Sequence, residues 1–208
     1  AVTQREHCTD DDVAQVILTD PAMAAELLKV YNSPLYRGVN NDASCRDVVV
    51  RLGMAVTQQL ITVFSMRELF MSKKTELRLA MQELWEHSRR VAAIAYVIAG
   101  HVKGINKDTA LMAGLTHDLG VIPVITYAEN FPELYDDSMA LQEAIKELRS
   151  EVGNTLMEGW NFSKEMVLAA VNAENWDYVS PGDGPNLADV VIAAQLHCMM
   201  DQGADLLP

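Results

Sequence analysis

The sequence predicts an all-α fold, and three features of the chain lead to this prediction. Apolar residues recur every three to four positions along most of the chain, which places them on one face of an α-helix. No long stretch alternates apolar and polar residues as a half-buried strand does. The breaks between the periodic segments carry proline, glycine or asparagine, which form turns. We therefore expect a multi-helix bundle.

The N-terminal part is predicted to contain four short helices. The apolar pattern is interrupted at Pro21, and the preceding Asp20 suits an N-cap followed by proline at the first helical position. A turn rich in Asn, Pro and Gly follows, after which Ser44 or Asp42 can cap a third helix. Gly53 then marks a tight corner that leads into the fourth apolar segment.

The remainder of the chain is predicted to be helical with two interruptions. Gly120 suits a left-handed C-terminal cap, and a loop or broken helix is expected from Pro123 to Asp137. The expected helices cover about 75–99, 107–119, 138–157, 164–173 and 187–200, with a loop at 178–186. We expect a single domain over 1–208, with an N-terminal helical lobe at about 10–70 and a second helical lobe at about 75–203.

The charge of the chain narrows the classes of partner. Lys and Arg number 16 and Asp and Glu 29, giving a net charge of −13. Such a field repels the phosphate backbone of nucleic acids and anionic lipid surfaces, so we expect neither as a partner. No apolar run is expected to reach the roughly 20 residues that cross a bilayer. A basic partner protein suits the acidic surface best.

The cysteines indicate a reducing compartment. Cys8, Cys45 and Cys198 lie far apart in the sequence, and no CxxC motif is present. An odd, sparse set of cysteines fits the cytoplasm better than a disulfide framework. A structural zinc site of the CxxC type is also excluded. We therefore expect a cytoplasmic protein.

The tetrapeptide that begins at His117 is the part of the chain best suited to metal binding or catalysis. His117 and Asp118 lie between a helical segment and Gly120, and His87 lies thirty residues upstream on another expected helix. A histidine from a neighbouring antiparallel helix can complete a nitrogen and oxygen set for a divalent ion. The small residues Ala113 and Gly114 would let the two helices approach closely. A buried polar pair retained for packing is the competing hypothesis.

The sequence resembles a known family in several segments. HSRRVAAIAYVIAG at 87–100 and DTALMAGLTHDLGVI at 108–122 are similar to the HD superfamily of metal-dependent phosphohydrolases. LTDPAMAAELLKVYNSPLYRGVNNDASCRDVVVRLGM at 18–54 and VGNTLMEGWNFSKEMVLAAV at 152–171 resemble its HDOD branch, the HD-related output domain of bacterial signalling proteins. The resemblance covers about residues 13–203 and implies an HD-like helical fold.

The resemblance also implies a metal set made of one His, a His-Asp doublet and a distant Asp. His87 matches the first position, and His117 and Asp118 match the doublet. The distant Asp falls at Gln195, a neutral and weak ligand, and His197 lies too far round the helix to replace it. A retained site would hold one divalent ion of manganese, magnesium, zinc or iron.

Three further positions depart from the family members that hold two metal ions. Those relatives carry a Lys where this chain has Val121, and further His ligands where it has Arg149 and Glu174. Glu174 can bind a metal ion, but the positive charge of Arg149 repels one. The resemblance therefore implies a degenerate site at Gln195, Val121, Arg149 and Glu174.

Three hypotheses of function remain at this point. The favoured one is a catalytically inactive regulatory domain in bacterial signal transduction, which acts through contact with signalling proteins and holds no metal or a weakly bound one. The alternative is a phosphohydrolase with one metal ion at His87, His117 and Asp118, in which Asp118 or Glu174 takes a proton from the metal-bound water. In the third, His117 and Asp118 only hydrogen-bond across a helix junction.

Aromatic and apolar residues outside this site could line a groove for a partner, although helical spacing makes them core residues first. They are Val30, Tyr31, Leu35, Tyr36, Trp160, Phe162, Trp176 and Tyr178.

Overall fold

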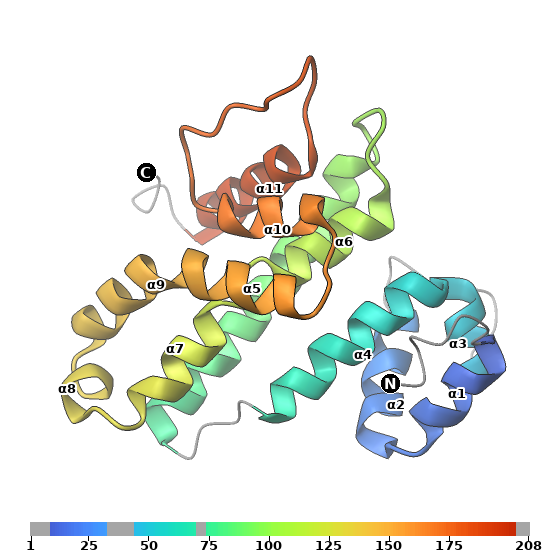
Figure 1. Ribbon diagram of the computed structural model, residues 1–208, viewed down its shortest axis with the longest axis horizontal. Coiled ribbons are helices and arrows are strands. Elements are labelled where there is room, and N and C mark those ends of the chain that lie inside the picture. Colours follow the sequence, from blue (N-terminus) through green and yellow to red (C-terminus); the bar gives the residue numbers. More distant parts are fainter. Residues whose placement is uncertain (1–8, 33–43, 70–73, 203–208) are drawn as a thin grey trace. The chain divides into compact units, whose positions relative to one another are not determined.

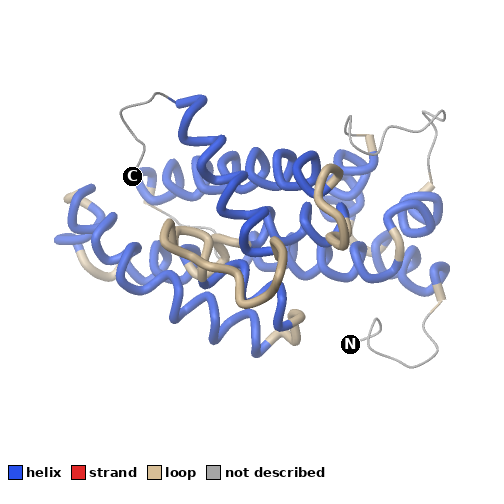
Figure 2. The backbone as a smooth tube through the Cα atoms, turned by 90° about the horizontal axis from the view of Figure 1, so that it is seen from above, coloured by secondary structure: helices blue, strands red, loops and turns tan. Residues whose placement is uncertain are grey.

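The protein is all-α, as predicted. The computed structural model describes residues 9–32, 44–69 and 74–202, and within these ranges every regular element is a helix (Figures 1 and 2). The chain divides into two compact units, residues 1–69 and residues 70–208. The extent of a single domain over the whole chain stays a prediction.

The first unit is a set of short helices joined by capped turns. Asp20 Oδ1 accepts a hydrogen bond from Met23 N, which confirms the predicted N-cap before Pro21. Ser44 caps the third helix, whereas Asp42 lies outside the described residues. Gly53 adopts a φ of 81°, a conformation that favours glycine and forms the predicted corner. The helices are α1 (Asp10–Leu18), α2 (Pro21–Tyr31), α3 (Cys45–Leu52) and α4 (Met54–Leu69).

The second unit contains the remaining helices. The longest of them, residues 75–99, packs against three others. One part of its core is a buried apolar cluster of Leu77, Val121, Ile125 and Ala128. The helices are α5 (Thr75–Ala99), α6 (Lys107–Thr116), α7 (Val121–Ala128), α8 (Pro132–Tyr135), α9 (Ser138–Gly159), α10 (Lys164–Val171) and α11 (Leu187–Gln202). In Figure 1, α7 runs beside α5 and α9.

One apolar segment is longer than we expected. Residues 107–128 span 22 residues, and the most apolar window of 18 residues within them has a mean hydropathy of 1.3, so the segment is long and apolar enough to cross a membrane. The segment consists of α6, a turn and α7, and 78% of its most apolar window is buried inside the protein. Its apolar character is accounted for by the core of the second unit.

Two local predictions in this segment are wrong. The helix expected over 107–119 ends at Thr116, and Gly120 has a right-handed φ of −65° instead of the expected left-handed cap. The region expected as a loop or broken helix from Pro123 to Asp137 is a broken helix, made of α7, which already begins at Val121, a turn, and α8. Pro123 is tolerated in α7 because it is the third residue of the helix, where a backbone N–H has no intrahelical acceptor. Gly120 is required for close packing, which is described below.

Candidate functional site

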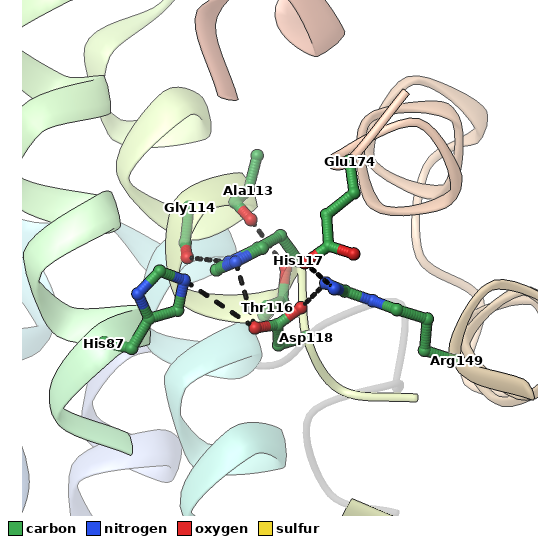
Figure 3. Close-up of polar contacts among 8 residues, drawn as sticks. All are labelled: His87, Ala113, Gly114, Thr116, His117, Asp118, Arg149 and Glu174. Atoms are coloured by element: carbon green, nitrogen blue, oxygen red, sulfur yellow. Dashed lines mark hydrogen bonds and ion pairs between the residues drawn. The ribbon is translucent and has the colours of Figure 1, made fainter. Parts of the chain in front are cut away.

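Six of the residues that the sequence singled out come together in the second unit. Figure 3 shows five of them around the turn that follows α6, with Asp118 between His87 and Arg149. The carboxylate of Asp118 is therefore the centre of the cluster. The six are His87 on α5, His117 and Asp118 after α6, Arg149 on α9, Glu174 after α10, and Gln195 on α11.

A close contact between α5 and α6 brings the two histidines together. A Cβ atom added to Gly114 would lie 2.6 Å from the Cα of Ala92, so no larger residue fits at this crossing. The approach places the rings of His87 and His117 edge to face, with centroids 5.3 Å apart. The predicted role of a small residue at position 114 is confirmed by this contact.

A second close contact brings α9 against the other side of the turn. A Cβ atom added to Gly120 would overlap the carbonyl oxygen of Arg149 and lie 2.6 Å from the backbone nitrogen of Gly153. Gly120 follows Asp118 by two residues, so the same contact holds the backbone of Arg149 beside the turn. This is why the Arg149 side chain reaches Asp118.

The His117 ring is oriented as a metal ligand would be. Its Nδ1 lies 2.7 Å from the carbonyl oxygen of Gly114, which can only accept a hydrogen bond. Neutral His117 therefore carries its proton on Nδ1 and presents a lone pair at Nε2. That Nε2 is buried, lacks a hydrogen-bond partner, and lies 3.2 Å from Asp118 Oδ2. Two acceptors that face each other in this way favour a proton or a cation between them.

His87 completes one side of the cluster. Its Nε2 lies 3.8 Å from Asp118 Oδ2, and its side chain hydrogen-bonds that of Gln195. Burial lowers the pKa of His87, and the charge of His117 lowers it further, while Asp118 and the bond to Gln195 oppose the change. His87 is therefore held in its neutral form, the form that binds metals.

Arg149 occupies the opposite side of Asp118. One guanidinium nitrogen, Nη2, pairs with Asp118 Oδ1, and the other, Nη1, pairs with Glu174 Oε1. Burial alone would raise the pKa of Asp118, but the neighbouring His117 and the charge of Arg149 hold it well below its usual range. The carboxylate is thus ionised and already paired with a cation.

The ligand atoms of the described residues are spaced as one divalent ion requires, but their negative charge offsets that of the ion only in part. One nitrogen or oxygen atom from each of His87, His117 and Asp118 lies within 4.8 Å of the other two. Tetrahedral bonds of about 2.1 Å would separate ligand atoms by about 3.4 Å, near the separations from Asp118 to the two histidines. Gln195 brings no charge, however, and Arg149 shares the single carboxylate.

Other predicted residues lie away from this cluster. The side chain of Val121 packs in the apolar core cluster, where a charged side chain would have no partner. His197 is exposed. Of the suggested partner groove, Tyr31 is buried, Trp160, Phe162, Trp176 and Tyr178 are half-buried, and Leu35 and Tyr36 lie outside the described residues.

Comparison with protein families identifies the fold family. The model of the HDOD domain matches residues 1–176 of this chain. The chain belongs to the HDOD family. The match extends from the first unit across the cluster as far as Glu174, but ends before Gln195. Among curated proteins, no relative matches the sequence.

Solved structures agree with this assignment. A crystal structure from Shewanella amazonensis SB2B named "Putative metal-dependent phosphohydrolase" has a TM-score of 0.83 and 28% identity, covering 99% of this chain and 75% of that one. An HDOD domain protein of unknown function from Geobacter sulfurreducens has a TM-score of 0.65 and 24% identity, and the match covers 99% of this chain and 70% of that one. A "Putative signal transduction protein" from Marinobacter aquaeolei VT8 has a TM-score of 0.63 and 19% identity, and the match covers 99% of this chain and 48% of that one. The last two likenesses support the fold alone.

Sequence reasoning missed the most consequential contact of this HDOD cluster. Arg149 was expected only to repel a metal ion, whereas it pairs directly with Asp118. The signal in the sequence was the pair of glycines, Gly120 and Gly153, which mark a backbone approach between α7 and α9. Spacing along the chain does not reveal which glycines face each other.

Proposed function

We propose that this HDOD chain is a regulatory module of bacterial signal transduction that acts in the cytoplasm through contact with other proteins and hydrolyses no phosphate ester. The observation that carries this proposal is the ion pair between Arg149 and Asp118. In a hydrolase, the ligand carboxylate offsets the charge of the metal ion. Here a guanidinium of the protein itself offsets the charge of that carboxylate.

The acid–base properties of the cluster support the same proposal. A general base works best when its pKa lies near the working pH. The pKa of Asp118 is held far below that range by the neighbouring His117 and the charge of Arg149. Glu174, the second candidate base, is engaged by Arg149. Gln195 adds neither charge nor basicity, so a metal-bound water would lack an efficient proton acceptor.

The proposed partner is a protein with a basic surface. The net charge of −13 favours association with a positively charged protein and disfavours nucleic acid and anionic membranes. The name "Putative signal transduction protein" of a structural neighbour supports a signalling role, as does the HDOD family itself. Cys45 is a free thiol, as a reducing cytoplasm would keep it.

The test of the proposal is metal content measured together with hydrolysis. The purified chain is equilibrated with Mn²⁺, Zn²⁺, Mg²⁺ or Fe²⁺ and dialysed, and the bound metal per chain is counted. Aryl phosphomonoesters and phosphodiesters are then offered, with Asp118→Asn as the inactive control. We expect far less than one ion per chain and no metal-dependent hydrolysis above the control. One tightly held ion that is lost in His117→Ala, with hydrolysis that follows the ion, would overturn the proposal.

A second test concerns the partner. The chain is immobilised and exposed to lysate of its host, with and without a metal chelator. We expect a basic protein to be retained equally in both conditions and by the Asp118→Asn variant. Retention that disappears with the chelator would show instead that a bound metal controls the interaction.

His117→Ala separates a structural role from a catalytic one. The variant removes the buried hydrogen bond to Gly114 and should cost roughly 1–3 kcal/mol of unfolding free energy. The exposed His101→Ala serves as the matched control, with an expected change below about 0.5 kcal/mol. Urea denaturation of both variants measures the difference, and an unchanged stability of His117→Ala would contradict a structural role.

The alternative function is a metal-dependent phosphohydrolase with one ion at His87, His117 and Asp118. Two observations favour it, namely the convergence of these three ligand atoms and the name of the Shewanella amazonensis neighbour. A site with three protein ligands and open positions is chemically sufficient to activate water. The same metal count and hydrolysis assay decides between this function and the regulatory one.

A further inference from the structure

We propose that Arg149 is an internal counterion that competes with a divalent cation for Asp118, so that this one side chain sets the metal affinity of the cluster. The inference concerns the affinity of the site for a cation, and it holds whether the domain signals or hydrolyses. It rests on the same Arg149–Asp118 pair as the proposed function, but the metal count and hydrolysis assay of the wild type test that function separately.

The geometry of the guanidinium carries the first step. Arg149 bridges two carboxylates, with one nitrogen on Asp118 and another on Glu174, and its side chain is only 10% exposed. A planar guanidinium with donors on separate nitrogens is suited to such a bridge. Arg149 is the cation paired with Asp118 among the described residues, and it approaches from the side opposite His87 (Figure 3).

The second step is the conflict between two cations on one carboxylate. A metal ion held by His87, His117 and Asp118 Oδ2 would share the Asp118 carboxylate with the guanidinium on Oδ1. Like charges at such short range repel strongly where solvent is excluded. Binding of a divalent ion therefore has to weaken or displace the Arg149 contact, and the contact in turn lowers the affinity for the ion.

The third step is that Arg149 has a second anchor when it leaves Asp118. Glu174 lies in the turn after α10, and its side chain is 45% exposed. The backbone of Arg149 is held by the contact with Gly120, so only the side chain needs to move. Occupation of the buried site would thus shift the guanidinium toward Glu174 and the protein surface.

The experiment compares metal affinity in matched arginine variants. Arg149→Met removes the charge inside the cluster, and Arg89→Met removes the charge of an exposed arginine that pairs with Glu86 three residues away on α5. Titration calorimetry with Mn²⁺ and Zn²⁺ measures each Kd. We expect Arg149→Met to bind at least about tenfold more tightly than the wild type, and Arg89→Met to bind as the wild type does.

Two further variants test whether charge is the cause. Arg149→Gln is neutral but keeps a hydrogen-bond donor, so it should gain affinity as the Met variant does. Arg149→Lys keeps the charge and should stay close to the wild type. The gain should vanish when Asp118→Asn is added to Arg149→Gln. An affinity of the wild type equal to that of both neutral variants, or a gain that survives Asp118→Asn, would overturn the inference.

The wild-type protein supplies a readout that does not depend on a variant folding. Circular dichroism first establishes which variants fold without metal. In the wild type, the NMR signal of the Arg149 guanidinium Nε–H should move on addition of Zn²⁺ at concentrations that shift the ring signals of His117. A guanidinium signal that stays in place while the histidine signals shift would contradict the competition.

Discussion

The two sides of Asp118 differ in what they contribute to the cluster. On the side of α5 and α6, the ring nitrogens of His87 and His117 face one carboxylate oxygen. On the side of α9 and α10, the cation Arg149 holds the other oxygen and is itself held by Glu174. One side retains the features of a metal site, and the other supplies the charge that a metal ion would have brought.

The difference explains how the fold would persist without a metal ion under the proposed function. A buried carboxylate without a partner is costly, so loss of a metal ion has to be offset by another cation. Arg149 provides this from inside the protein, while the close packing of α5 and α6 preserves the histidines. Under the proposed function, the cluster is a structural ion-pair network in which the ligand geometry persists.

The largest effect should come from separating the two sides. Gly120→Ala would place a methyl group against the backbone of Arg149 and Gly153, which cannot move without shifting α9. We expect a loss of at least about 3 kcal/mol in unfolding free energy, or failure to fold. Gly159→Ala, at the end of α9, is the control, because nothing lies within 4 Å of its added methyl group. Chemical denaturation measures both, and equal stabilities would show that the approach of α9 is not fixed at Gly120.

A smaller effect should come from removing the shared carboxylate. Asp118→Ala leaves the nearly buried Arg149 with Glu174 still beside it and should cost up to about 3 kcal/mol. Glu174→Ala removes a half-exposed partner and should cost less than about 1 kcal/mol.

The double variant Asp118→Ala/Arg149→Met completes this comparison. It removes both charges and should recover part of the stability lost in Asp118→Ala, because no unpaired guanidinium remains. Urea denaturation of the single and double variants gives the coupling energy. Strictly additive losses would mean that the pair contributes nothing beyond its separate side chains.

The smallest effect concerns pH and belongs to the histidine side. The pKa of His87 is lowered in the folded protein, mainly by burial, so the unfolded chain binds a proton more readily. The stability from neutral His87 is fully present above its unfolded pKa of about 6.5 and is lost as the pH falls through that value toward the lower folded pKa. His87→Gln should therefore flatten the dependence of unfolding free energy on pH just below 6.5. An unchanged slope would show that His87 contributes nothing to it.

Most of the helices could be predicted because their signals are local. The cap at Asp20, the corner at Gly53 and the apolar spacing each depend on a few neighbouring residues. The region after Gly120 could not be predicted in the same way. A glycine there suits a helix cap, but in the folded protein it serves the approach of α9, and Pro123 is accommodated in the first turn of α7.

The candidate residues were likewise predictable in part. His87, His117 and Asp118 were found from residue types and from the resemblance to the HD superfamily, and the structure brings them together. The partnership of Arg149 was not found, because it joins residues 31 positions apart on different elements. Neither spacing nor charge indicates which of the surrounding cations turns toward a given carboxylate.

The sequence by itself determined an all-α chain, its family, and a histidine and aspartate set in which Gln195 replaces a charged ligand. These follow from local periodicity and from residue identity. Only the tertiary structure decided that the other charge in the cluster comes from Arg149. The physical reason is the backbone contact at Gly120, since packing between helices places a side chain beside a partner distant in sequence.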